Sequence, residues 1–183
     1  MLKDMPAEQD RRPPRLPAPC ARVLAKVLRW CPPFAAARGV TLGLSASGVS
    51  IGSASVFWAM PELSGPGDVY SRLKIGTYCG FNARCHFELY DQITIGDHVA
   101  VGQDVMFLTR TYDTSDPAQR GRHTGSAPIE VGNGAWLGAR CTILPGVKIG
   151  AGSVIGASVV VSKDVPDNIL VMGNRRLSLA KWR

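Results

Sequence analysis

A repeat of six residues constrains the fold of this chain more than any other feature of its sequence. An aliphatic residue stands at every sixth position through the C-terminal half, at Val131, Leu137, Ile143, Ile149, Ile155 and Val161. A small or apolar residue follows each of these four positions later, at Ala135, Cys141, Val147, Ser153, Val159 and Val165. An α-helix would need spacings near 3.6, and a two-sided strand would alternate every two residues. The period instead predicts a solenoid, in which each hexapeptide supplies one short strand and one corner, and three hexapeptides complete a coil.

The same period continues upstream of this region, with two interruptions. Its positions there are Ile75, Phe81 and Phe87, followed by Ile95, Val101 and Phe107. We predict four coils, at residues 75–92, 95–112, 131–148 and 149–166. A weaker trace of the repeat around Val49 and Ile51 predicts a degraded first coil. Residues 113–130 are polar and rich in Gly, Pro and Ser, which predicts a loop extruded from the coil.

These features predict an all-β fold, a parallel β-helix over residues 39–183 with a C-terminal tail at 167–183. Residues 1–38 are interpreted as an N-terminal extension. Within it, residues 20–30 place apolar side chains on one helical face and basic side chains mostly elsewhere, which predicts a short amphipathic helix. Such a helix would cap the open end of the coil, since solenoid ends need covers. Contact of this helix with a membrane surface is the less favoured alternative.

The cysteines indicate the redox setting of the protein, and the net charge indicates the kind of partner it binds. Cys79 and Cys141 occupy small inward positions of the repeat, where a thiol packs as a modest hydrophobe. No secretory segment and no membrane-spanning apolar run is evident, so we expect a reduced, cytoplasmic setting. The net charge of +7 favours an anionic partner. The basic residues are dispersed without interleaved aromatic residues, which argues against nucleic-acid binding.

The histidines argue against a metal site. The chain has three, His86, His98 and His123, separated by 12 and then 25 residues. This spacing does not match the close pair of histidines that a zinc site of a related fold uses, so no metal is expected. His98 falls at a corner of the repeat and is interpreted as a surface or turn residue.

Residues 75–176 resemble the hexapeptide-repeat acyltransferases, and within that family the galactoside, maltose and nodulation-type O-acetyltransferases. Residues 132–174 carry the resemblance most closely, with the sequence GNGAWLGARCTILPGVKIGAGSVIGASVVVSKDVPDNILVMGN. The resemblance implies a left-handed parallel β-helix and a homotrimer with active sites between subunits. It also implies an enzyme that transfers an acyl group, usually acetyl, from acetyl-CoA to a hydroxyl of a small-molecule acceptor, a sugar or a natural product.

The resemblance further implies a coenzyme A site on the outer surface of the coil. In the family, the pantetheine arm contacts the backbone at small residues one coil apart, a position where a small side chain permits close approach. A lysine further along can meet a phosphate. Near the C-terminus the family usually has a proline before a basic residue, whereas this chain has two arginines, either of which could reach the nucleotide phosphate. The cofactor-binding candidates are Ala139, Ala157, Ser162, Lys163, Arg175 and Arg176.

On the acceptor side the chain departs from the family. The family's catalytic base is a histidine, and its position holds Tyr112, whose phenol is a weaker base at neutral pH. The family's acceptor-binding asparagine is present as Asn82, but the aspartate that accompanies it is replaced by Tyr90. The aromatic residue that opens the coil after the loop is present as Trp136. We therefore predict a cleft whose acceptor chemistry is altered, with Asn82, Tyr90 and Trp136 as substrate-binding candidates.

Three residues are candidates for the catalytic base: His123 in the loop before residue 131, His86 near Asn82, and Tyr112 acting in a dyad. Two further hypotheses stay open beside acyl transfer. In the first, the cleft performs CoA-independent cyclisation, elimination or isomerisation, with tyrosines donating hydrogen bonds to a developing oxyanion. In the second, the chain is a noncatalytic trimeric scaffold.

Overall fold

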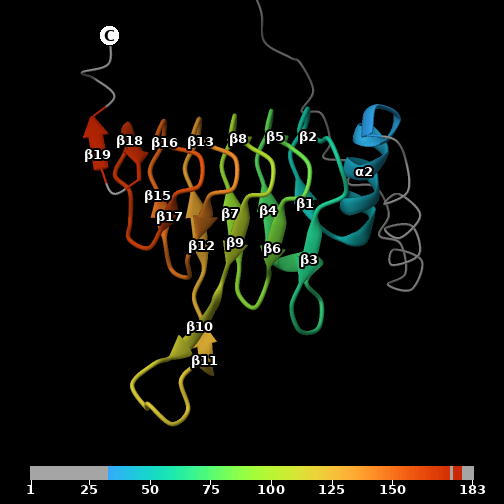
Figure 1. Ribbon diagram of the computed structural model, residues 1–183. Helices are drawn as coiled ribbons and strands as arrows, with labels where there is room; N and C mark the ends of the chain where they lie inside the picture. The colour runs from blue at the N-terminus through green and yellow to red at the C-terminus, as the bar shows by residue number, and fades with distance from the viewer. Residues whose placement is uncertain (1–32, 174, 179–183) are drawn as a thin grey trace, which may run out of the picture.

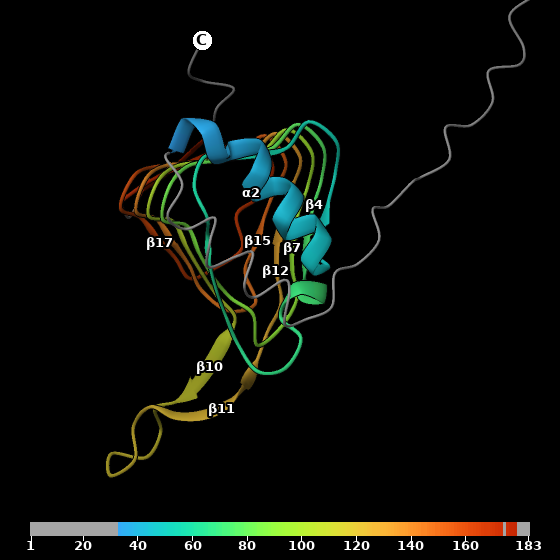
Figure 2. The same cartoon turned by 90° about the vertical axis from the view of Figure 1, so that its right-hand side faces the viewer.

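The structure is a computed structural model that describes residues 33–173 and 175–178, and it consists almost entirely of short strands. Three sheets of parallel strands form the sides of a coil with a triangular outline, seen from the side in Figure 1 and end-on in Figure 2. Successive strands of the coil belong to successive sheets, so three strands complete one coil. The predicted left-handed parallel β-helix is therefore confirmed.

We call the three sheets faces A, B and C. Face A contains β1 (Ser50–Ile51), β4 (Leu73–Ile75), β7 (Ile93–Ile95), β12 (Ile129–Val131) and β15 (Lys148–Ile149). Face B contains β2 (Val56–Phe57), β5 (Gly80–Phe81), β8 (Ala100–Val101), β13 (Trp136–Leu137), β16 (Val154–Ile155) and β18 (Ile169–Met172), with β19 (Arg175–Ser178) at its edge. Face C contains β3 (Glu62–Ser64), β6 (His86–Glu88), β9 (Met106–Leu108), β14 (Thr142–Ile143) and β17 (Val160–Val161). A short 3-10 turn, η1 (Tyr70–Arg72), precedes β4.

Equivalent residues of successive coils lie directly above one another. In face A, Ile75 pairs with Ile95, Ile95 with Val131, and Val131 with Ile149. None of these four side chains is more than 5% exposed. The predicted first coil is present as β1 to β3, which pair with β4 to β6. Five coils are complete, and Val165, bridged to Ile149, begins a sixth that continues into β18.

Stacked phenylalanines fill the interior of the N-terminal coils. The rings of Phe57 and Phe81 stack with their centroids 4.3 Å apart, and those of Phe87 and Phe107 stack at 4.8 Å. The rings of Phe81 and Phe87 meet edge to face at 6.0 Å. All four side chains are fully buried. Aromatic pairs in these geometries attract one another beyond the effect of their buried area, so this column stabilises the first three coils.

A helix covers the N-terminal end of the coil. Helix α2 (Pro33–Ser47) lies across that end in Figure 2, and its residues Val40 and Leu44 are fully buried. It therefore has the capping role that was predicted for residues 20–30, which lie outside the described residues. Helix α2 also crosses residue 39, where the sequence placed the start of the β-helix.

The segment predicted as an extruded loop does leave the coil, but part of it is an antiparallel hairpin. Strands β10 (Arg110–Asp113) and β11 (Arg122–Ser126) pair with a register shift between Thr111 and Tyr112. The hairpin projects from the corner between faces C and A (Figures 1 and 2). Composition alone predicted an irregular loop here. In the structure, cross-strand pairing satisfies the backbone polar groups of part of this segment.

The C-terminal end of face B is closed by β18 and β19, which pair antiparallel. The predicted tail at 167–183 therefore includes strands that extend the sheet. In the described part of the chain, no helix has both the length and the apolar character needed to span a membrane.

Three unpaired cysteines, Cys79, Cys85 and Cys141, lie in the core, and none is more than 2% exposed. Burial raises the pKa of each thiol, and it brings the pKa of Cys85 and Cys141 to about 12. Their positions confirm the predicted inward packing of Cys79 and Cys141. Because the thiolate is the reactive form, these thiols are expected to be inert in the folded protein.

We therefore expect iodoacetamide to leave Cys79, Cys85 and Cys141 unmodified in the native protein and to alkylate all three after unfolding in guanidinium chloride. Peptide mass spectrometry of the two samples measures the modification at each position. Rapid alkylation of any of the three thiols under native conditions would contradict their assignment as packing residues.

Candidate functional site

Two adjoining hollows lie over the C-terminal coils, and Gly173 lines both of them. The first has a volume of about 640 Å³ and walls that are mostly apolar. The second has a volume of about 460 Å³. The predicted site residues that line one or the other hollow are Trp136, Ala139, Ala157, Ser162 and Lys163.

Ala139 and Ala157 lie one above the other at the B–C corner, where the chain turns from face B into face C. The backbone N–H of Ser158 donates to the carbonyl oxygen of Ala139 at 2.8 Å, which joins the two corners. The glycine before Ala139 is required by this stacking, because a Cβ on Gly138 would lie 2.6 Å from the backbone nitrogen of Ala157. The corner therefore carries small side chains and leaves its backbone accessible from outside.

Asn82 lies at the B–C corner two coils away from Ala139, whereas Trp136, in face B, lines the hollow itself. Asn82 is exposed directly after β5, and its Oδ1 accepts a hydrogen bond from the backbone N–H of Ala83 at 2.9 Å. The side chain of Trp136 is 56% exposed and lines the 640 Å³ hollow. The indole thus supplies an apolar wall beside the two stacked alanines.

The other residues predicted for acceptor binding and catalysis, apart from His86, lie near a different corner, between faces C and A. Tyr90 follows β6 there, and Tyr112 is 48% exposed in β10. The backbone of Tyr112 pairs with that of His123 in β11; the side chain of His123 lies outside the described ones. His86 is half-buried in β6, and its Nε2 shares a hydrogen bond of 2.8 Å with the hydroxyl of Ser64.

Arg110, at the start of β10, joins the two tyrosines and was not predicted from the sequence. Its guanidinium carbon lies 4.8 Å from the centre of the Tyr90 ring and 5.1 Å from the centre of the Tyr112 ring. Its Nε is buried and has no hydrogen-bond partner in the described part of the chain. The sequence did contain a signal for this contact. Both positions that depart from the family resemblance hold tyrosine, and an arginine, a residue that stacks on aromatic rings, precedes Tyr112 by two positions.

The two groups of candidate residues stand at opposite ends of the strands of face C. Ala139 and Ala157 precede β14 and β17 at the B–C corner, and Asn82 precedes β6 at the same corner. Tyr90 and the hairpin follow the strands of face C at the C–A corner, where Ser162 and Lys163 also follow β17. A single copy of the chain therefore does not close a pocket around both groups.

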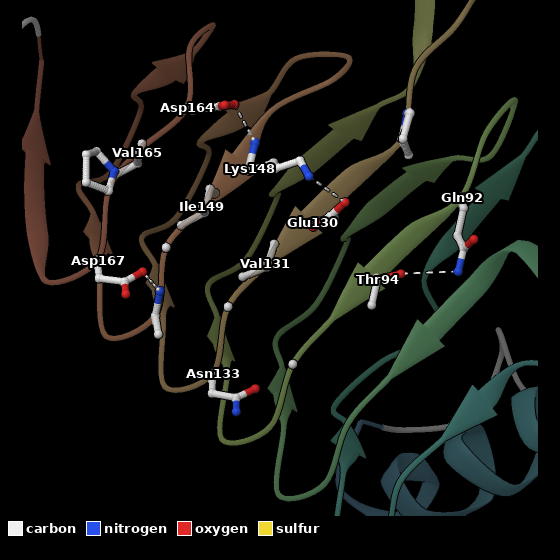
Figure 3. A pocket seen from close by; sticks show the side chains of 16 residues that line it. Gln92, Thr94, Glu130, Val131, Asn133, Lys148, Ile149, Asp164, Val165 and Asp167 are labelled. Carbon is white, nitrogen blue, oxygen red and sulfur yellow. Dashed lines mark hydrogen bonds and ion pairs between the residues drawn. The ribbon is translucent and has the colours of Figure 1, made fainter.

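A larger hollow, of about 890 Å³, lies on face A and is shown in Figure 3. Its charged side chains already interact with neighbouring groups of the chain. The Nζ of Lys148 lies 3.1 Å from a carboxylate oxygen of Glu130, and the backbone N–H of Lys148 donates to Asp164 at 2.9 Å. A carboxylate oxygen of Asp167 accepts the backbone N–H of Ala151 at 2.8 Å. None of the predicted site residues lines this hollow, so we do not assign the site to it.

Arg175 and Arg176 lie in β19, and their backbones pair with those of Met172 and Val171 at the end of face B. Their side chains are outside the described ones. Among residues 33–173 and 175–178, no group of three His, Cys, Asp or Glu side chains is arranged to hold a metal ion.

Sequence comparison relates the repeat to known transferases. Residues 128–163 match the family model described as bacterial transferase hexapeptide (six repeats). A putative acetyltransferase of Schizosaccharomyces pombe is 40% identical over 93 residues, which are 51% of this chain and 45% of that protein. The galactoside O-acetyltransferase of Lactococcus lactis is 37% identical over 100 residues, or 54% of this chain and 46% of that protein. The chain thus spans about half the length of the curated relatives it matches.

Solved structures extend the likeness over most of the coil. A hexapeptide-repeat acetyltransferase of Vibrio cholerae has a TM-score of 0.74 at 26% identity, over 87% of this chain and 88% of that one. A galactoside acetyltransferase solved in complex with coenzyme A has a TM-score of 0.74 at 23% identity, over 87% of this chain and 78% of that one, and shares the fold. This chain is therefore a hexapeptide-repeat protein with a left-handed parallel β-helix, similar over that fold to hexapeptide-repeat acetyltransferases.

Proposed function

We propose that this chain is a CoA-dependent O-acyltransferase that transfers an acyl group, usually acetyl, to a hydroxyl of a sugar or natural-product acceptor. The observation that carries the proposal is the hollow of about 640 Å³ beside Trp136, where Ala139 and Ala157 stack one coil apart. The relatives named as acetyltransferases support this reaction class. The same fold holds coenzyme A in the galactoside acetyltransferase.

The shape and chemistry of the B–C corner suit an extended thiol arm. Two small side chains in register let the arm run along the coil close to the backbone, and Trp136 with Met172 forms apolar walls beside it. Lys163 lines the adjoining hollow, where its ammonium group could meet a phosphate of the cofactor. Arg175 and Arg176 are proposed to reach the same part of the nucleotide.

We further propose that the active site forms between copies of the chain in a homotrimer. Ala139 and Ala157 lie at one end of the face C strands, whereas Tyr90 and the β10–β11 hairpin lie at the other end. A second copy that packs its C–A corner against the B–C corner of the first would bring the two groups together. Each site would then take its cofactor residues from one subunit and its acceptor residues from the next.

Acyl transfer to a hydroxyl needs a base, because an alcohol becomes a good nucleophile only as its proton is removed. We propose His123 for this role, with His86 and Tyr112 as the alternatives. Tyr112 holds the position where the family has its histidine, and the hairpin register places His123 opposite it. His86, in contrast, shares its Nε2 hydrogen bond with Ser64 on face C. The three buried, unpaired thiols support a reducing, cytoplasmic setting for this reaction.

The cofactor site is tested by Ala157→Trp. Ala157 is exposed, so the indole can extend over the surface without entering the core, and it would fill the proposed path of the thiol arm. We expect calorimetric titration with acetyl-CoA to show at least about tenfold weaker binding, equivalent to about 1.4 kcal/mol.

The matched control for this variant is Ala151→Trp. Ala151 also follows a corner glycine, but it lines the hollow on face A and should leave acetyl-CoA binding unchanged. Unchanged affinity in Ala157→Trp would contradict the cofactor site. If the wild-type protein binds neither acetyl-CoA nor CoA at millimolar concentration, CoA-independent chemistry or a scaffold role replaces acyl transfer.

The base is tested by His123→Gln. We expect kcat to fall by about 10² to 10⁴, with acetyl-CoA affinity unchanged, because a positioned base contributes a factor of this size. His86→Gln is the comparison variant, and thiol release from acetyl-CoA is the readout. A normal rate in His123→Gln together with a large loss in His86→Gln would transfer the role to His86.

Sharing of the site between subunits is tested by mixing two defective variants. Sedimentation equilibrium should give three times the subunit mass of 19.6 kDa. When Ala157→Trp and His123→Gln are co-expressed, some interfaces combine the intact cofactor residues of one subunit with the intact base of another. Random equal mixing predicts recovery of about one quarter of wild-type activity. Activity no higher than that of the two separate variants would argue that each site lies within one chain.

A further inference from the structure

The guanidinium of Arg110 lies against two aromatic rings. Its guanidinium carbon lies within 4.8 Å of the Tyr90 ring centre and 5.1 Å of the Tyr112 ring centre. Stacking engages the flat faces of the guanidinium, whereas its N–H groups point outward in the plane of the group. We call Tyr90, Arg110 and Tyr112 the arginine clamp.

The guanidinium of Arg110 forms no ion pair with a carboxylate among the described residues. Glu88 contacts Arg110 only through the backbone, whose N–H donates to a carboxylate oxygen at 3.1 Å. Asp113, on the same strand, pairs with Arg122 at 3.4 Å. Asp91, next to Tyr90, accepts hydrogen bonds from the hydroxyl of Ser126 and from a backbone N–H.

The Nε of Arg110 adds a second, independent observation. This atom is buried and forms no hydrogen bond within the described residues. A buried donor without a partner costs free energy, and a charged donor costs more than a neutral one. An oxygen acceptor that displaced the groups now covering Nε would remove that cost.

The location of the clamp connects it to the acceptor. Arg110 and Tyr112 lie on β10, and the backbone of Tyr112 pairs with that of His123, the proposed base. A group bound at the guanidinium would therefore be held on the strand that pairs with the strand of the base. The clamp is half-exposed at Tyr112, so a small molecule can reach it.

We propose that the arginine clamp binds an oxyanion, a carboxylate or a phosphate, carried by the hydroxylated acceptor. Both groups offer oxygen pairs that match the fork of a guanidinium, and two stacked rings hold that fork in place. The net charge of +7 would also attract such a ligand. This inference rests on the proposed acyl transfer, and it narrows the acceptor to anionic sugars or anionic natural products.

The test compares three probes that share a sugar ring: glucose, glucuronate and glucose 6-phosphate. We expect at least one anionic probe to bind the wild-type protein about tenfold or more tightly than glucose, measured by calorimetry, and to be acetylated with a correspondingly higher kcat/KM. Comparing the two anions identifies which oxyanion the clamp prefers. Equal binding of all three probes would overturn the proposal.

The residue is tested with Arg110→Gln and Arg110→Lys. Glutamine removes the charge and should abolish the preference for the anion, whereas lysine keeps the charge without the planar fork and should retain only part of it. Arg122→Gln is the matched control, since it removes one positive charge from the same hairpin and should keep the preference. A preference that survives Arg110→Gln would refute the clamp.

Two measurements distinguish oxyanion binding from a purely structural role of the stacked arginine. Melting temperature and sedimentation mass of Arg110→Gln are recorded, because an unchanged anion preference with a lower melting temperature or an altered mass would show that the stack is only structural. Titration with acetyl-CoA distinguishes failure of the oxyanion site from failure of the proposed acyl transfer. If the protein binds acetyl-CoA but its preference for anions does not depend on Arg110, the oxyanion site is refuted and acyl transfer stands. If anion binding depends on Arg110 but acetyl-CoA does not bind, acyl transfer is refuted and the oxyanion site stands.

Discussion

The stacking of each inward side chain on its counterpart in the next coil is the interaction on which this structure depends. Ile95 lies between Ile75 and Val131, and parallel pairing joins their backbones at every step. A shift of one residue would turn each buried side chain toward solvent, so the apolar period also sets the register. The close approach of successive coils also requires glycine at corner positions, because a Cβ on Gly138 would lie 2.6 Å from the backbone of the next coil.

This stacking also determines where an extended ligand can bind. Residues at equivalent corners repeat along the coil at the spacing of paired strands, about 4.8 Å. Ala139 and Ala157 thus form a track of small side chains, and Trp136 stands beside it on face B. A larger hollow lies elsewhere, on face A, where Glu130 and Lys148 pair with each other. We therefore based the proposed cofactor path on the small size and register of the side chains at the B–C corner and not on the volume of a hollow.

The hairpin leaves the repeat between the third and fourth coils. Freed from the six-residue register, β10 can carry large polar side chains such as Arg110 and Tyr112. Tyr112 and Tyr90 stand where the family resemblance led us to expect a histidine and a carboxylate, and the guanidinium of Arg110 lies against both rings. The proposed change of acceptor would need no change in the coil, because the hairpin projects away from the core (Figure 2).

The sequence by itself determined the coil, its repeat and the small residues of the proposed cofactor track. The reason is that each side chain of the six-residue repeat packs only against its counterparts in the neighbouring coils. It also indicated that Tyr90 and Tyr112 depart from the family resemblance. Only the tertiary structure decided that α2 covers the first coil, that the extruded segment pairs as a hairpin, and that Arg110 lies between the two tyrosines. Tyr90 and Arg110 are twenty positions apart, the same separation as the paired residues of β6 and β9, so they lie one coil apart. They meet because one coil returns the chain to the same corner, where the hairpin leaves.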